Sequence, residues 1–211
     1  MYKFSGCYTA TITPMKKNLE VDYEGLKQLV EFQSEQGVGG VLAVGTTGES
    51  PTLTWEEHIE VIRKVHEFSE GRFLTIGGTG SNNTNESLEA TREVSDFGVK
   101  CVLLVDPYYN GPSSLEIRKE YIEPIAKEFP DVQIIPYVIP GRSGTQLLPQ
   151  DLAILHSQFE NVRAVKEATG NFENMRLTRR LCGEDFDILS GDDDKTYDMM
   201  KDPQIKASGV I

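Results

Sequence analysis

The chain has 211 residues, of which 38% are hydrophobic, so we expect one domain with a substantial core. Its 33 acidic residues outnumber its 21 lysines and arginines, and the net charge of −12 argues against nucleic acid or an anionic membrane surface as a partner. No apolar run reaches the roughly 18 residues of a membrane helix, and the N-terminus lacks a signal-peptide core, so we expect a cytoplasmic protein that handles small molecules.

Short apolar runs, which we predict to be strands, alternate with helical patterns along the whole chain. The starts of these runs lie 22 to 33 residues apart, which is the spacing of βα units. The predicted strands span residues 8–13, 41–44, 73–76, 101–105, 133–138, 162–165, 187–189 and 209–211. Cys101 falls in one of these runs and Cys7 directly precedes the first; with Cys182 they form no CxxC pair, so we expect reduced thiols in the core.

Helix start signals stand between the predicted strands. Two are capping boxes, in which an N-cap hydroxyl and a glutamate three residues later each accept a backbone N–H. These boxes begin at Thr54 and Ser113. The other signals are the N-cap residues Asp22 and Asn171 and the first-turn proline Pro149.

Seven strand–helix alternations and an eighth strand predict a parallel (β/α)8 barrel, or TIM barrel, over residues 1–211. The alternative is a doubly wound open sheet, but such a sheet usually has a glycine-rich phosphate turn after its first strand. Residues 13–16, Thr-Pro-Met-Lys, contain no such turn. The chain ends at Ile211, inside the predicted eighth strand, and a barrel needs this strand and a covering helix to avoid an open edge. We therefore expect the natural polypeptide to be longer.

Lys166 stands at the end of the sixth predicted strand, where catalytic residues of a barrel gather. Burial disfavours an ammonium and lowers its pKa, which leaves a neutral amine able to attack a carbonyl carbon. Lys166 is therefore our candidate for a Schiff base with a keto acid. The alternative is an ordinary strand lysine whose stem lies on apolar surface with its head in water.

Other strand ends carry further candidates. Residues 45–50 follow the second strand, and their small side chains leave backbone N–H groups free to hold a carboxylate. The alternative is a plain glycine- and threonine-rich turn without a ligand. After the fourth strand, Tyr108 and Tyr109 are either hydroxyl donors or loop packing. At the fifth strand, Tyr137 is a candidate proton relay and Arg142 a carboxylate clamp; the alternatives are a buried tyrosine and a surface arginine.

We predict no metal site. Three aspartates follow the seventh strand, but no second cluster supplies more ligands, so helix capping is the better interpretation of residues 192–194. The three histidines lie on helical segments without the spacing of metal ligands: His58, His66 and His156.

These segments together resemble the dihydrodipicolinate synthase family, within the class I, Schiff-base pyruvate aldolase superfamily. The resemblance extends along the whole chain, with the motifs in register. They are Gly45-Thr46-Thr47-Gly48-Glu49-Ser50, Pro107-Tyr108-Tyr109-Asn110, Tyr137 with Pro140-Gly141-Arg142-Ser143-Gly144, Val165-Lys166-Glu167, Ser190-Gly191-Asp192-Asp193 and Gly209-Val210-Ile211. The family barrel continues through an eighth helix into a small helical C-terminal region, which is absent from this chain.

The resemblance implies a lyase that condenses pyruvate with L-aspartate 4-semialdehyde to give 4-hydroxy-tetrahydrodipicolinate, a step toward lysine and diaminopimelate. It implies no metal or organic cofactor. Lys166 would form the imine, and a hydroxyl relay of Tyr137, Thr46 and Tyr109 would move protons. Val138 stands where the family usually has asparagine, but it should face away from Tyr137, so we expect the relay to survive.

The resemblance also implies how the substrates are held. Thr46 and Thr47 would bind the pyruvate carboxylate, and Arg142 would receive the carboxylate of the semialdehyde. The backbone carbonyl of Ile211 would lie beside the lysine. Family members are often tetramers of tight dimers, so we expect a homodimer or homotetramer, with Tyr109 reaching into the neighbouring subunit's site.

Many family members are inhibited by L-lysine bound at the dimer interface. The residues that match this site are Ser50, Trp55, His58, Asn82, Glu86 and Tyr108, and Trp55 resembles the plant-type site. For Glu86 the alternative is an acid in the first turn of a helix, and for Trp55 it is local packing.

Two alternative functions stay open. N-acetylneuraminate lyase and 2-keto-3-deoxygluconate aldolase share the lysine and the tyrosine, but they usually lack the arginine at Arg142. A non-catalytic relative that binds lysine or assembles with a full-length partner is the second alternative. The presence of Lys166, Tyr137 and Thr46 together argues against it.

Overall fold

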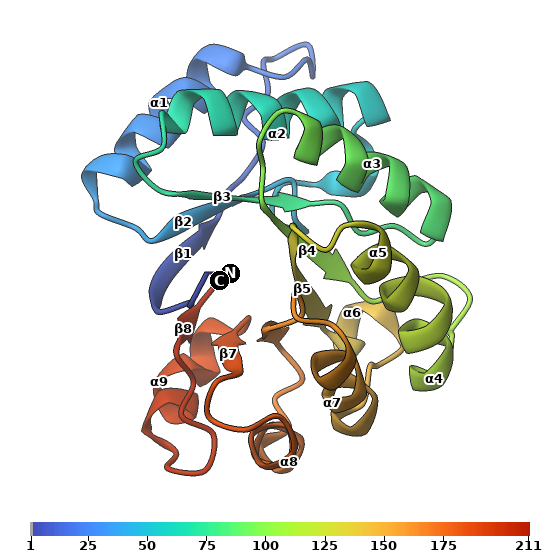
Figure 1. Ribbon diagram of the computed structural model, residues 1–211. Coiled ribbons are helices and arrows are strands. Elements are labelled where there is room, and N and C mark those ends of the chain that lie inside the picture. The colour runs from blue at the N-terminus through green and yellow to red at the C-terminus, as the bar shows by residue number, and fades with distance from the viewer. Residues whose placement is uncertain (1) are drawn as a thin grey trace.

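The computed structural model describes residues 2–211, and its sheet is a closed barrel of eight parallel strands in chain order (Figure 1). The ring closes where β8 pairs with β1, through Gly6 with Gly209 and Cys7 with Val210. The strands are β1 Gly6–Ala10, β2 Gly40–Ala43, β3 Leu74–Gly78, β4 Cys101–Val105, β5 Gln133–Val138, β6 Ala164–Glu167, β7 Asp187–Ser190 and β8 Gly209–Val210. The predicted (β/α)8 barrel is therefore confirmed, and the open doubly wound sheet is wrong.

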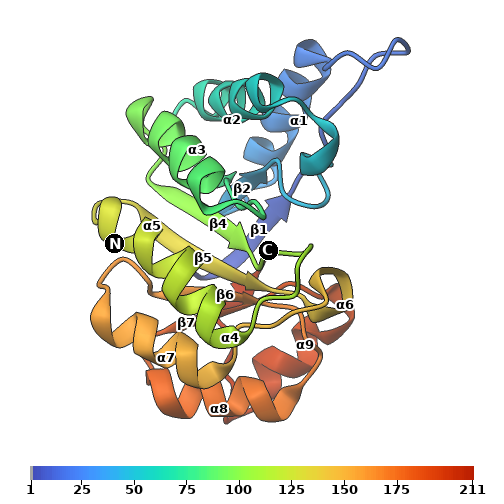
Figure 2. The ribbon, with the colours of Figure 1, turned by 90° about the vertical axis from the view of Figure 1, so that its right-hand side faces the viewer.

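Helices lie around the outside of the strands (Figures 1 and 2). Segments α4, η2 and α5 follow one another without a break, and η2 has the wider π-helical turn. The helices are α1 Tyr23–Glu35, η1 Ser50–Thr52, α2 Trp55–Ser69, α3 Thr84–Asp96, α4 Ser114–Glu116, η2 Ile117–Ile122, α5 Glu123–Glu128, α6 Pro140–Ser143, α7 Pro149–Gln158, α8 Phe172–Cys182 and α9 Asp193–Lys201. No helix within residues 2–211 is both long enough and apolar enough to cross a membrane.

The predicted helix starts are confirmed. The side chains of Asp22 and Asn171 each accept a backbone N–H of the first turn, and both capping boxes, at Thr54 and Ser113, are formed. Pro149 is the first residue of α7. Because these contacts satisfy N–H groups that have no partner inside the helix, each fixes where the chain leaves a loop and enters a helix.

The core has two layers, one inside the barrel and one between the strands and the helices. Tyr137 belongs to the inner layer and Val138 to the outer one, so the expectation that Val138 faces away from Tyr137 is confirmed. Cys101 and Cys182 are buried free thiols. The expectation for Cys7 is wrong, because strand residues alternate in direction: Tyr8 points into the barrel and Cys7 is exposed.

Two strands, the first and the sixth, differ from the prediction by two or more residues at both ends. The first strand spans Gly6–Ala10 rather than 8–13, because its partners on β2 and β8 pair only with residues 6–10. The sixth spans Ala164–Glu167 rather than 162–165, which places Lys166 within the strand, paired with Tyr137 of β5. The strand pairing thus sets the backbones of these two residues side by side.

Candidate active site

A cavity of about 740 Å³ opens beside β6 and receives residues from loops far apart in the chain. Six of the seven residues predicted for catalysis and substrate binding line it: Thr46, Thr47, Tyr137, Arg142, Lys166 and Ile211. Tyr109 is the exception, since its side chain is 88% exposed and does not line this cavity. The described chain therefore assembles the predicted site apart from this tyrosine.

The Lys166 side chain is only 5% exposed, so the alternative of a lysine with its head in water does not hold. Its Nζ lies 4.4 Å from the centroid of the Tyr137 ring. The pKa of the amine is lowered to about 8, mainly by burial and also by the nearby Arg142 guanidinium, with Asp193 opposing the shift. A substantial fraction of the amine is therefore neutral near physiological pH and able to attack a carbonyl carbon.

The space for this lysine depends on a glycine directly after β7. A Cβ atom added to Gly191 would lie 2.9 Å from Cε and 3.0 Å from Cγ of Lys166, and 3.1 Å from Cβ of Ala168. The glycine therefore leaves the room that the lysine stem fills. A pattern within one segment does not reveal this role of Gly191, because the contact joins the ends of two different strands.

Tyr137 is 4% exposed and lies in the inner layer of the barrel. Burial raises the pKa of its hydroxyl, while the charge of Arg142 and a hydrogen bond with Thr46 oppose the rise. The phenol therefore stays protonated near neutral pH, and its ring lies against Nζ of Lys166. This geometry suits proton transfer at an atom bonded to Nζ.

The turn after β2 holds its backbone in an unusual conformation. Val44 is buried and has φ of +55°, and Glu49 has φ of +57°, both in the left-handed region that β-branched and long side chains rarely adopt. Within residues 2–211, the N–H groups of residues 45–48 donate no hydrogen bond to the protein. These N–H groups, which include those of Thr46 and Thr47, are therefore available to donate hydrogen bonds to a bound carboxylate.

Two glycines, Gly48 and Gly78, pack closely against Val44. A Cβ on Gly78 would lie 2.4 Å from the Val44 carbonyl oxygen, and one on Gly48 would lie 3.0 Å from Cα of Val44. Nothing in the local pattern of residues 41–48 signals this close packing, because Gly78 comes from the neighbouring strand β3. The roles of Val44 and Gly78 in shaping the turn are consequently not among the predictions from sequence.

A second cavity, of about 330 Å³, lies near the start of α2. It brings together all six residues predicted for lysine binding: Ser50, Trp55, His58, Asn82, Glu86 and Tyr108. The His58 ring stacks at 4.8 Å on Trp55, and its Nε2 donates to the Gly78 carbonyl at 2.6 Å. Burial lowers the pKa of His58, with the bond to Gly78 opposing, so the ring is neutral near pH 7.

A smaller cavity of about 170 Å³ lies between the other two. It shares Thr46, Tyr137 and Arg142 with the cavity of Lys166, and it shares Ser50 and Tyr108 with the second cavity. Side chains of the two predicted sites therefore line one common space.

The helix-capping interpretation is confirmed for Asp192, whose side chain accepts the N–H of Asp194 at the start of α9. Asp192, Asp193 and Asp194 also line the cavity of Lys166. Within residues 2–211, no three or more histidine, cysteine, aspartate or glutamate side chains gather in a way that could hold a metal ion.

Comparisons with known proteins agree on one family. A model described as the dihydrodipicolinate synthetase family matches residues 3–211. The 4-hydroxy-tetrahydrodipicolinate synthase of Methanococcus maripaludis is 45% identical over 206 residues, which are 98% of this chain and 68% of that protein.

Solved structures give the same result. Dihydrodipicolinate synthase from Aquifex aeolicus is 41% identical with a TM-score of 0.93, and the match covers 99% of this chain and 69% of that one. The enzyme from Cyanidioschyzon merolae with lysine bound is 36% identical, also with a TM-score of 0.93 and a coverage of 99% and 69%. The chain thus spans about two thirds of the length of these relatives.

Proposed function

Because the chain belongs to the dihydrodipicolinate synthetase family, we propose that it condenses pyruvate with L-aspartate 4-semialdehyde to give 4-hydroxy-tetrahydrodipicolinate. The observation that carries the proposal is the buried amine of Lys166, with a lowered pKa, beside the Tyr137 ring and in one cavity with Arg142. The reaction makes the chain a lyase of lysine and diaminopimelate biosynthesis.

The first half of the reaction uses the neutral amine of Lys166. The amine attacks the ketone carbon of pyruvate, and loss of water leaves an imine. The protonated imine draws electrons from the adjacent methyl group, so that loss of a proton there gives an enamine. Tyr137 and Thr46 hold and return these protons without placing a permanent charge beside the cationic imine. Free N–H groups in residues 45–48 support binding of the pyruvate carboxylate.

In the second half, the enamine carbon attacks the aldehyde of the semialdehyde, and the amino group of the adduct then displaces the lysine as the ring closes. The chemistry needs no metal or organic cofactor, since the imine itself accepts the electrons. Arg142 is exposed at the mouth of the cavity, where its planar fork suits a carboxylate. This arginine favours the semialdehyde over the sugar acids of the related aldolases.

The proposal includes a cytoplasmic location and assembly into homodimers or homotetramers, with Tyr109 completing the hydroxyl relay of a neighbouring subunit. The assembly is supported by Tyr109, whose side chain is 88% exposed and does not line the cavity of its own chain.

The function is tested by treating the protein with pyruvate and borohydride and measuring its mass. We expect one reduced pyruvyl group on Lys166, located by peptide mapping. Turnover with aspartate semialdehyde should exceed turnover with N-acetylneuraminate or 2-keto-3-deoxygluconate. Absence of the adduct supports the non-catalytic relative, and a preference for a sugar acid supports the related aldolases.

L-lysine should bind in the second cavity and inhibit the reaction. The cavity offers the Glu86 carboxylate to an ammonium group, and the Trp55 ring beside His58 to the aliphatic stem. The relative from Cyanidioschyzon merolae was solved with lysine bound. We expect a heat of binding in calorimetry and a loss of activity, both weakened at least about tenfold in Glu86→Gln. A titration without heat and without inhibition would reject this site.

A further inference from the structure

Asp106 is a fully buried carboxyl group directly after β4, with an exposed fraction of 0%. Its Oδ2 accepts the backbone N–H of Leu147 at 2.9 Å, and its own N–H donates to the Tyr137 carbonyl at 3.1 Å. Its Oδ1 is buried and has no hydrogen-bond partner within residues 2–211. A buried polar atom is rarely left in this state, so the side chain requires an explanation.

The segment that Asp106 holds directly follows α6, the short helical turn Pro140–Ser143 that carries Arg142 and is called the Arg142 turn below. After α6 the chain runs through residues 144–148 to α7, and Leu147 lies in this connection. Two further contacts tie the connection to the loop after β4: Thr145 Oγ1 donates to the Pro112 carbonyl, and the N–H of Leu148 donates to Ser114 Oγ at 2.8 Å. The connection that follows the Arg142 turn is therefore tied at three points to the chain that follows β4.

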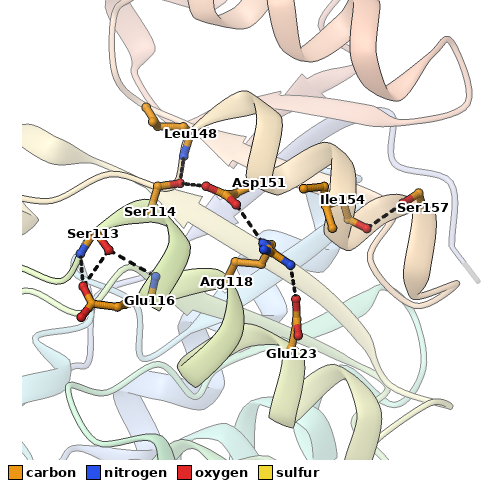
Figure 3. A network of polar contacts seen from close by, with 9 residues as sticks. All are labelled: Ser113, Ser114, Glu116, Arg118, Glu123, Leu148, Asp151, Ile154 and Ser157. Carbon is orange, nitrogen blue, oxygen red and sulfur yellow. Dashed lines mark hydrogen bonds and ion pairs between the residues drawn. The ribbon is translucent and has the colours of Figure 1, made fainter.

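Figure 3 shows the outer end of this connection. Ser114 Oγ also donates to Asp151 of α7, whose other oxygen accepts from Arg118 Nε at 2.8 Å. These outer groups lie partly in solvent, where hydrogen bonds compete with water. Asp106 is fully buried, so among these contacts its hydrogen bond with the Leu147 N–H is the one least weakened by competing water.

The Asp106 carboxyl is suited to accept a hydrogen bond in its neutral form rather than to carry a charge. Burial raises the pKa of Asp106 to about 8; the bond from Leu147 opposes this rise, and the nearby Glu167 carboxyl adds to it. The Asp106 carboxyl in turn contributes to raising the pKa of the nearby Tyr121 phenol. A neutral acid keeps one carbonyl oxygen for the Leu147 N–H and avoids an uncompensated charge on the unpartnered oxygen.

We propose that Asp106 is a positioning residue for the second substrate: by accepting the Leu147 N–H from inside the protein, it fixes the turn that holds Arg142. Asp106 does not touch the substrate, and it sets how well Arg142 meets the carboxylate of the aldehyde. The inference rests on the proposed function of Arg142, and it assigns to Asp106 a part in selecting the aldehyde but not in capturing pyruvate.

The test compares D106A with D106N. Alanine removes the acceptor and frees the turn, so we expect KM for aspartate semialdehyde to rise roughly 10- to 100-fold. The KM for pyruvate and the yield of the borohydride adduct on Lys166 should stay within about twofold of the wild type. Asparagine keeps an uncharged acceptor of the same shape, so D106N should restore the KM for the aldehyde.

The matched control is N161A. The Asn161 amide is also buried and donates to the carbonyls of Ala126, Phe129 and Val132, so its loss destabilises the fold without touching the Arg142 turn. We expect N161A to lower Tm with unchanged KM values. If D106A does not fold, T145V carries the test, because it deletes the Thr145 contact of the same connection after α6 and should raise the KM for the aldehyde alone.

An equal rise of both KM values in D106A, no rise at all, or a failure of D106N to restore the aldehyde KM would overturn the positioning role. A wild-type protein that forms no pyruvate adduct would overturn the proposed function instead. The two failures are therefore separate results of the same set of measurements.

Discussion

Replacing Lys166 by methionine should abolish pyruvate trapping and lower the rate of condensation by roughly 10³-fold or more, while making the folded protein more stable at pH 7. Methionine has nearly the length of the lysine stem and carries no charge. The gain arises because burial lowers the lysine pKa from 10.5 to about 8. Lowering the pKa by this amount corresponds to about 3 kcal/mol in the free energy of unfolding.

The pH dependence of this gain has a definite sign. Below pH 8 the lysine is protonated in both states, so the folded wild type bears the full cost of the buried ammonium. As the pH rises from about 8 to 10.5, the unfolded chain binds more protons than the folded one, and the wild type gains stability. The advantage of Lys166→Met should therefore be greatest below pH 8 and vanish near pH 10.5.

Denaturant titrations at several pH values measure this difference. Lys27 lies exposed on α1, so Lys27→Met is the matched control and should leave both trapping and the pH dependence unchanged. A Lys166→Met protein that is less stable than the wild type at pH 7 would contradict the cost assigned to the buried ammonium. Trapping that persists in this variant would remove Lys166 from the mechanism.

Gly78→Ala should weaken pyruvate binding at least about tenfold and cost about 2 to 4 kcal/mol of stability. The new Cβ would lie 2.4 Å from the Val44 carbonyl oxygen, so the backbone at Gly78, at Val44 or at both must move to make room. The movement displaces the turn at residues 45–48, whose free N–H groups face the pyruvate carboxylate in the proposed complex. The Gly78 carbonyl also accepts from His58, so lysine inhibition should weaken too.

The neighbouring glycine provides the control. A Cβ on Gly77 would meet its closest atom, Cγ2 of Ile62, at 3.4 Å, which is an ordinary contact. Gly77→Ala should therefore keep the KM for pyruvate and most of the stability. Steady-state kinetics and thermal unfolding of the two variants decide the matter: similar behaviour of both would show that the close approach to Val44 does not shape the site.

The fold follows from local patterns that the sequence displays directly. Apolar runs at regular spacing, with capping boxes at Thr54 and Ser113 between them, predicted the barrel and the starts of its helices. The strand ends then placed Lys166, Tyr137 and Arg142 together, because parallel strands present their carboxyl ends on one side of a barrel. Each of these inferences needs only residues close to one another in the chain.

The missed features depend on residues far apart in the chain. The buried oxygen of Asp106 has meaning only beside Leu147, 41 positions away, and the conformation of Val44 depends on Gly78 of another strand. The exposure of Cys7 depends on which face of β1 turns inward. If β1 paired with its neighbours one residue further along, Cys7 would point into the barrel and be buried. Patterns within one segment cannot predict such contacts.

The pairing of Gly6 with Gly209 joins nearly the first residue of the barrel to nearly the last. During synthesis on a ribosome, β1 gains its second neighbour only after β8 has emerged. Until then one side of β1 is an unpaired edge, open to association with other nascent chains. The same late contact carries a high loop-closure entropy, so completing the ring should be a slow event that follows assembly of the other seven strands.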